Sequence, residues 1–326
     1  AQSGRDALNR AGLPLGGAQL VLAQLDRVLQ PRPHRTRQPP VPQPTARPYH
    51  ETMPQPASRG PSPAATVTVG TGPVTTDEEA RREWPWEDAE FGDHYETPKA
   101  AYRDVRPLLR LAAKGLGVQP ETVRIFDPYY CRGHVVTCLH QLGFATVQHT
   151  KRDFYADIAA GWVAPHDVLL TNPPYSGEHK ERLFRFLLDA QRSGGPAPFM
   201  LLLPAWSANK LAWRQLLWCL AKLRSGERSV RFEDAARGER AERVGAFSDR
   251  LEEAAGCFFV VPAGRYHFVP AVAAREEAPF DGIWFCGGFA SVEKCRKAVD
   301  KAAAKAAAKA VVKHDAQQPL PSSPAS

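Results

Sequence analysis

The stretch Asp167-Val168-Leu169-Leu170-Thr171-Asn172-Pro173-Pro174-Tyr175-Ser176 predicts a buried strand that stops abruptly at two prolines. Each proline fixes its own φ and biases the preceding residue toward extended geometry, so the backbone after Leu170 is nearly predetermined. The side-chain carbonyl of Asn172 and the free backbone carbonyl of Pro173 then form two fixed acceptors at the carboxyl end of the strand. Such acceptors can hold a flat –NH2 group and direct its lone pair at an electrophile, while the Tyr175 ring stacks on the planar system that carries the group.

Asn-Pro-Pro-Tyr after a hydrophobic strand resembles motif IV of the S-adenosylmethionine-dependent amino-methyltransferases. This family includes adenine-N6 DNA and RNA enzymes, guanine-N2 RNA enzymes and glutamine-N5 protein enzymes. The resemblance implies that Asn172, Pro173 and Tyr175 are catalytic residues and that Tyr175 also contacts the substrate. It leaves open whether the rest of the chain supplies a cofactor site, and for which substrate.

The segment His94-Tyr95-Glu96-Thr97-Pro98 precedes a helical pattern over 101–113. Thr97 is a suitable N-cap for this helix, and Pro98 suits its first position. Taken alone, the segment indicates a capped helix. In this place it also resembles motif X of adenine methyltransferases, which implies that Tyr95, Thr97 and Pro98 touch the methionine end of the cofactor.

A strand over 123–126, the turn Asp127-Pro128-Tyr129-Tyr130-Cys131-Arg132-Gly133 and a helix over 134–142 are typical of a nucleotide cradle. The turn resembles motif I, which has the form Asp-Pro-x-x-Gly-x-Gly. Cys131 replaces the first glycine, and its Cβ narrows the approach to a ligand and disfavours positive φ. The resemblance implies cofactor contacts by Asp127, Tyr129 and Gly133.

Two weaker segments follow, and both resemble cofactor motifs. A strand over 143–149 ends at His149, where the family has an acid that binds the ribose hydroxyls. His149 can still form a hydrogen bond but brings no negative charge, and a surface histidine is an equal alternative. Asp153-Phe154 resembles motif III, in which the acid accepts from the adenine amino group and the aromatic ring covers the base.

The second half of the domain continues the alternation. A helix over 178–190 precedes a strand over 199–204, and strands over 256–261 and 282–286 form a hairpin pair. The charged insertion 222–250 has too little apolar periodicity to assign. Aromatic residues interleaved with cations suit a stacked, charged substrate. The expected substrate contacts are Tyr175, Trp206, Lys210, Arg265 and Tyr266.

This alternation predicts a doubly wound α/β domain over 93–290. The resemblance implies the mostly parallel, seven-stranded, Rossmann-like methyltransferase sheet with one antiparallel strand near the end. Residues 1–76 are rich in proline and arginine and are expected to be largely disordered, apart from an amphipathic helix over 17–30. A solvated linker is the preferred interpretation, with a nucleic-acid-binding arm or an organelle transit segment as alternatives.

Residues 77–92 are acidic and are interpreted as a strap that docks on the domain. Residues 291–326 combine a basic Ala/Lys helix with a disordered end. The helix carries lysines four residues apart, at 297, 301, 305, 309 and 313. This helix is either solvated or in contact with phosphates.

The composition limits the class of protein. The 326 residues are 43% hydrophobic and carry a net charge of +7, with a pI of about 9.2, which permits a polyanionic partner. The six cysteines form no CxxC pair, which favours reduced, buried thiols in an intracellular protein of unresolved compartment. No apolar run approaches the length of a membrane span. The first residue is Ala rather than Met, so a truncated or processed chain is expected.

Three functions are compatible with these patterns. The first is S-adenosylmethionine-dependent methylation of an exocyclic amine on nucleic acid, with adenine N6 preferred and no metal required. The second is protein-glutamine N5 methylation, against which the basic tails and the motif X resemblance argue. The third is a catalytically silent domain that serves as a nucleic-acid-binding or assembly module, with a protein partner possible through the tails; the Cys131 and His149 departures keep this alternative open.

Overall fold

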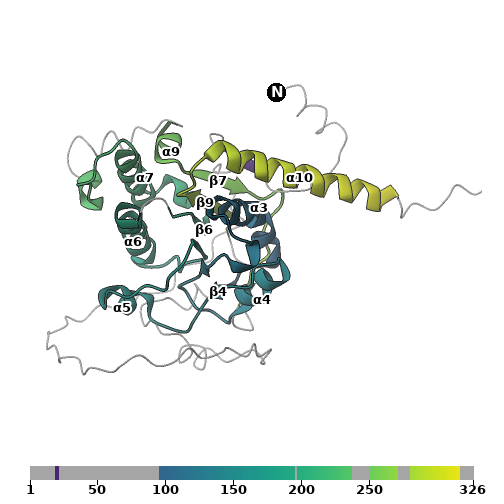
Figure 1. Ribbon diagram of the computed structural model, residues 1–326, viewed down its shortest axis with the longest axis horizontal. Coiled ribbons are helices and arrows are strands. Elements are labelled where there is room, and N and C mark those ends of the chain that lie inside the picture. The colour runs from purple at the N-terminus through teal and green to yellow at the C-terminus, as the bar shows by residue number, and fades with distance from the viewer. Residues whose placement is uncertain (1–18, 22–94, 195–196, 237–249, 271–279, 316–326) are drawn as a thin grey trace, which may run out of the picture.

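The computed structural model describes residues 19–21, 95–194, 197–236, 250–270 and 280–315 (Figure 1). Strands from both ends of the chain form one mixed sheet in the order β1-β7-β9-β6-β5-β3-β4. Its strands are β1 (Gln19–Val21), β3 (Ile125–Phe126), β4 (Val147–Gln148), β5 (Val168–Thr171), β6 (Phe199–Pro204), β7 (Phe258–Val261) and β9 (Gly282–Gly287). Strands β4, β3, β5 and β6 pair in parallel, and β9 is antiparallel to both β6 and β7.

The described part of 93–290 contributes six strands to this sheet, rather than the seven expected from the sequence. The seventh member, β1, pairs antiparallel with the β7 edge and comes from the segment expected to be an amphipathic helix. At Gln19–Val21 that helix prediction is wrong. An unpaired sheet edge offers a row of backbone donors and acceptors, and such a long-range partner leaves no local sequence pattern.

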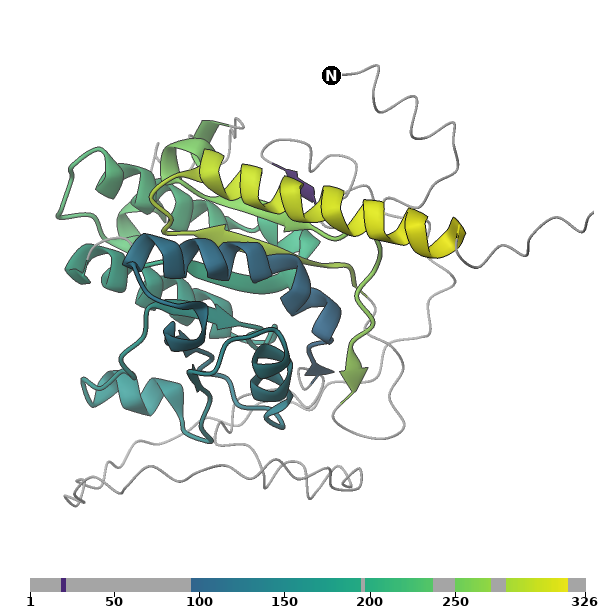
Figure 2. The same cartoon turned by 45° about the vertical axis from the view of Figure 1, so that its right-hand side comes forward.

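Helices cover both faces of the sheet. One face carries α3 (Lys99–Leu116), α4 (His134–Gln141) and α10 (Val292–Asp315), and α10 lies alongside α3 (Figure 2). The other face carries α5 (Phe154–Ala159), α6 (His179–Gly194) and α7 (Leu211–Arg224). Each face has its own hydrophobic cluster, because successive side chains of a strand point to opposite sides. The alternation over 93–290 therefore produces the predicted α/β layers.

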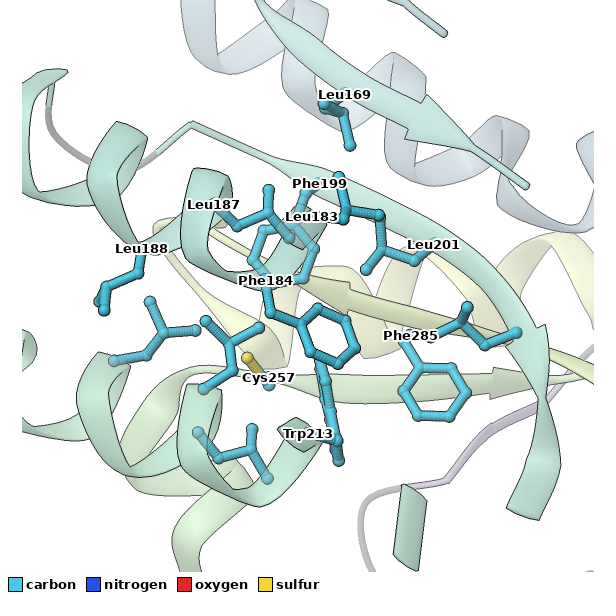
Figure 3. Close-up of a cluster of buried hydrophobic side chains, with 14 of the residues drawn as sticks. Leu169, Leu183, Phe184, Leu187, Leu188, Phe199, Leu201, Trp213, Cys257 and Phe285 are labelled. Carbon is cyan, nitrogen blue, oxygen red and sulfur yellow. The ribbon is translucent and has the colours of Figure 1, made fainter. Parts of the chain in front are cut away.

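The cluster under α6 and α7 is built around aromatic side chains (Figure 3). Trp213 meets Phe285 of β9 edge to face, with ring centroids 4.9 Å apart, and Phe184 of α6 packs on the same indole. Such pairs bury large apolar area in a fixed geometry. The cluster therefore fixes α6, which follows Asn172-Pro173-Pro174-Tyr175, against the sheet.

The insertion 222–250 belongs to this core in its described part. Val230, Phe232 and Ala235 are buried around the turn η5 (Phe232–Ala236), and α9 (Arg250–Ala255) packs on α7. With Leu223 at the end of α7, four buried apolar positions stand among many charges, too sparsely to show a period, which explains why no element is predicted there. No helix among the described residues is both long and apolar enough to cross a membrane.

The start of α3 differs from the prediction. Pro98 occupies the N-cap and Lys99 is the first helical residue, so the assignment of Thr97 as N-cap is wrong. The Thr97 side chain is buried and hydrogen-bonds with Tyr102 instead.

The remaining short elements are two turns and a second sheet. The turns are η3 (Pro120–Thr122) and η4 (Ala205–Asn209). In the second sheet, β2 (Tyr95–Glu96) pairs antiparallel with β8 (Val269–Pro270). The strap 77–92, His94, residues 316–326 and all of 1–76 except 19–21 lie outside the described residues.

Candidate active site

The candidate site lies where the strand order reverses. Strand β3 has β4 on one side and β5 on the other, so the turns after β3 and β5 leave the same edge of the sheet side by side. Open α/β sheets bind ligands at such positions. A direct contact joins the two turns, because the Thr171 hydroxyl donates to Asp127 Oδ1 at 2.5 Å.

Asp127 is a buried carboxyl group with few donors around it. Besides Thr171, the backbone N–H of Tyr129 donates to Oδ1 at 3.3 Å. Burial raises the pKa of Asp127 from its ordinary value to about 7, and the two donors offset only part of that effect. The protonated and ionised forms of this carboxyl group are therefore close in free energy near neutral pH.

His149 lies beside Asp127 and is 5% exposed, so it is not the surface histidine that the sequence allowed. Its Nδ1 is 3.1 Å from the Asp127 carbonyl oxygen and 3.5 Å from Asp127 Oδ2. Burial lowers the pKa of His149 to about 4. The imidazole Nε2 has no hydrogen-bond partner among the described residues, and Tyr130 stacks on the ring at 4.9 Å. His149 is therefore a neutral ring with one unused polar atom.

Glu96 of strand β2 is hydrogen-bonded to the turn 127–133, which resembles motif I. Glu96 Oε1 accepts the Arg132 backbone N–H at 2.7 Å, and the Cys131 thiol also hydrogen-bonds to Glu96. Burial raises the pKa values of both Glu96 and Cys131. Cys131, at the place of a family glycine, thus has a specific partner. Tyr95 and Pro98 flank this contact and are half-buried.

Gly133 is the N-cap of α4 and has a φ of +82°. This left-handed conformation favours glycine, since a side chain would strain the backbone. A Cβ built there would come no closer than 3.9 Å to another atom, the Tyr130 hydroxyl oxygen. A side chain at this position would therefore meet no close neighbour, and its cost would come from the backbone conformation.

The residues that resemble motif III lie under the site. Asp153 caps α5, because its Oδ1 accepts the backbone N–H groups of Tyr155 and Ala156 at 2.9 and 3.1 Å. Phe154 and Tyr129 are buried with their ring centroids 5.6 Å apart. They form part of the core beneath the turn that follows β3, and the adenine contacts expected of Asp153 and Phe154 stay predictions.

The Asn-Pro-Pro-Tyr turn is closed on itself. The Tyr175 hydroxyl donates to the Asn172 side-chain oxygen and lies 3.1 Å from the Leu202 carbonyl oxygen. Pro173 is buried, whereas Asn172 and Tyr175 are half-buried. Phe280 meets the Tyr175 ring edge to face at 5.0 Å. The acceptor expected to hold a substrate amine thus binds a tyrosine hydroxyl in this structure.

Three of the expected substrate residues lie near one another. The Lys180 ammonium donates to the Tyr175 carbonyl oxygen and is 5.8 Å from the centre of the Trp206 ring. Lys210 Nζ is 5.3 Å from the same ring. Tyr175, Trp206 and Lys210 are therefore brought together through Lys180.

Arg265 and Tyr266 are placed differently from each other. Arg265 donates to the Phe280 carbonyl oxygen and pairs with Asp281, so it lies beside the ring that meets Tyr175. Tyr266 is 4% exposed and donates to Asp104 of α3 at 2.7 Å, within the hydrophobic cluster on the α3 face. Tyr266 is therefore not brought together with the other expected substrate residues.

Sequence reasoning missed Glu96, Thr171, Tyr130 and Lys180. Glu96 and Tyr130 stand at variable positions of the motifs they resemble, and Thr171 appears as an ordinary last residue of a strand. Only Lys180 could have been found from the sequence, because it stands five residues after Tyr175 at the start of a predicted helix. Among the described residues, no group of three His, Cys, Asp or Glu could hold a metal ion.

Compared with protein-family models, with curated proteins and with solved structures, the chain gives no significant match.

Proposed function

We propose that this chain is an S-adenosylmethionine-dependent methyltransferase whose acceptor is an exocyclic amine of nucleic acid, preferably adenine N6. The observation that carries the proposal is the Thr171–Asp127 hydrogen bond at the strand-order reversal. It joins a turn that can orient an amine to a turn that can hold a charged nucleotide-like cofactor. The antiparallel strand β9 beside β6 supports the proposal, because the resemblance implies one antiparallel strand near the end of the sheet.

The residues present fit the polar groups of that cofactor. A cation beside Asp127 would favour its ionised form and offset the cost of burial. His149 Nε2 is a buried polar atom without a partner among the described residues, as a ribose hydroxyl would require. The α4 N-terminus at Gly133 suits an anionic group.

When bound, the cofactor supplies a methyl group on a positively charged sulfur. The chain's own part is to position the acceptor, because bringing two reactants into line contributes much of the acceleration in such reactions. Asn172 Oδ1 and the Pro173 carbonyl oxygen accept hydrogen bonds from the two N–H groups of the amine. Tyr175 must release Asn172 when the amine arrives, and its ring is then available to stack on the base.

A catalytically silent binding module is the second candidate. It is favoured by two contacts, because Asn172 already binds Tyr175 and Cys131 already binds Glu96. In that case the same residues would stabilise a closed turn, and the chain would bind nucleic acid without modifying it.

An Asn172→Ala variant separates the two candidates. Methyl transfer from labelled S-adenosylmethionine to mixed oligonucleotides should fall by roughly 100-fold or more, because the amine loses its orientation. Cofactor affinity by calorimetry should stay nearly unchanged, since Asn172 addresses the amine. Asn209→Ala, an exposed residue of η4, is the matched control. Wild-type turnover in Asn172→Ala would refute the catalytic assignment, and nucleic-acid binding with no transfer by the wild type would favour the silent module.

A further inference from the structure

Trp206 is a large aromatic residue left exposed at the carboxyl end of β6. Its side chain is 43% exposed in η4, although its neighbours Ala205 and Ser207 are buried. Lys180 comes from α6 and Lys210 precedes α7, so two separate elements bring ammonium groups to one indole. One lysine thus precedes Trp206 in the chain and the other follows it, and the indole ring stays accessible to a ligand.

The two ammonium groups bind the indole only loosely. They lie 5.8 and 5.3 Å from the ring centre, close to the outer limit of about 6 Å for cation–π contacts. A stacked base makes a stronger contact with an aromatic ring than an exposed cation does. An arriving base can therefore displace a lysine from the ring, and that lysine then remains within reach of a phosphate.

The platform is joined to the candidate active site by one residue. Lys180 donates to the Tyr175 carbonyl oxygen and also lies over Trp206. A nucleotide on Trp206 would thus neighbour the nucleotide whose base stacks on Tyr175. Inside a duplex both faces of a base are covered by the neighbouring bases, so only an unpaired base can stack on the Trp206 ring.

We propose that Trp206, Lys180 and Lys210 bind an unpaired nucleotide that flanks the target, and that the substrate is single-stranded nucleic acid. The inference rests on the proposed function for the identity of the neighbouring site, but the platform can be tested by binding alone. Stacking gives affinity with little sequence preference, because every base has a π-face.

Trp162 provides a matched control within the chain. It is 44% exposed, and the Arg152 guanidinium lies 4.5 Å from its ring centre. However, Trp162 lies in the connection between α5 and β5, and its cation Arg152 follows β4, whereas Trp206 follows β6. The two tryptophans thus share their exposure and a nearby cation, but among the described residues no hydrogen bond or cation–π contact joins Trp162 to the Asn-Pro-Pro-Tyr turn or to Lys180.

The test measures fluorescence anisotropy of a labelled 12-nucleotide single strand, and of its duplex, with the full-length chain. Trp206→Ala should weaken single-strand binding roughly 5- to 100-fold, whereas Trp206→Phe and Trp162→Ala should change it less than twofold. Equal affinity of Trp206→Ala and wild type, or tighter binding of the duplex than of the single strand by the wild type, would overturn the inference. Methyl transfer is followed in parallel. If Trp206→Ala loses binding and the wild type transfers no methyl group, the platform is supported and the proposed function is refuted. If the wild type transfers methyl groups and Trp206→Ala binds as tightly as the wild type, the proposed function is supported and the platform is refuted.

Discussion

The buried pair Asp127 and His149 should carry one shared proton between about pH 4 and pH 7, and single substitutions should reveal it. In the folded chain burial raises the pKa of Asp127 to about 7 and lowers that of His149 to about 4. In the unfolded chain the aspartate is ionised and the histidine protonated over most of this range. Folding therefore moves a proton from the imidazole to the carboxyl group without net uptake.

The two contributions have opposite signs. For Asp127 the folded state binds the proton more tightly, so its stabilisation is present below pH 3.8 and is lost as the pH rises through about 7. For His149 the unfolded state binds the proton more tightly, so its stabilisation is present above pH 6.5 and is lost as the pH falls through about 4. At 1.4 kcal/mol per pH unit these effects amount to about 4 and about 3 kcal/mol. In the wild type they nearly cancel.

Urea denaturation of wild type, Asp127→Asn and His149→Gln between pH 4.5 and 8 provides the measurement. Relative to wild type, Asp127→Asn should gain stability as the pH rises, because only the wild type then has to ionise a buried carboxyl group. His149→Gln should gain relative stability as the pH falls. Other titrating groups cancel in these differences. Difference curves with the same slope for both variants, or flat curves for both, would refute the assignment.

Two further predictions concern the edges of the site and the basic helix. Gly133→Ala should destabilise the chain by about 1–2 kcal/mol through its left-handed φ alone, because no atom lies closer than 3.9 Å. Gly115→Ala in α3 should instead stabilise it by about 0.5–1 kcal/mol, and denaturation of both variants checks the contrast. If α10 contacts phosphates, replacing the exposed Lys301 and Lys305 by Gln should reduce the slope of log affinity against log salt by about 2. An unchanged slope would leave both lysines solvated.

The strands next to the candidate site were predictable because their signals are local. The run before Asn172 and the run ending at Pro204 are apolar, short and stopped by proline, and the structure has β5 and β6 there. The left-handed φ of Gly133, found in the structure, is likewise a conformation that glycine favours by itself. These positions depend on backbone restrictions that each residue carries with it.

The contacts that make the site depend on partners far along the chain. Thr171 and Asp127 are 44 residues apart, and Glu96 and Arg132 are 36 apart. The pairing of β1 with β7 spans almost the whole domain. Such contacts follow from tertiary packing, which explains why the capping role expected of Thr97 and, at Gln19–Val21, the expected helix are wrong.

His149 and Cys131, the two residues that differ from the motifs this chain resembles, both contact the buried carboxyl groups of the site. Glu96 and Asp127 already bring two carboxyl groups to the buried turn, and both have raised pKa values because burial disfavours their charge. An acid at position 149 would add a third carboxyl group beside Asp127, in a place where burial already disfavours negative charge. A neutral imidazole avoids that cost and still offers Nε2 as a hydrogen-bonding atom. The thiol of Cys131 likewise gives Glu96 a donor that glycine lacks. The neutral ring of His149 beside Asp127 and the thiol of Cys131 beside Glu96 thus both limit the cost of burying a carboxyl group.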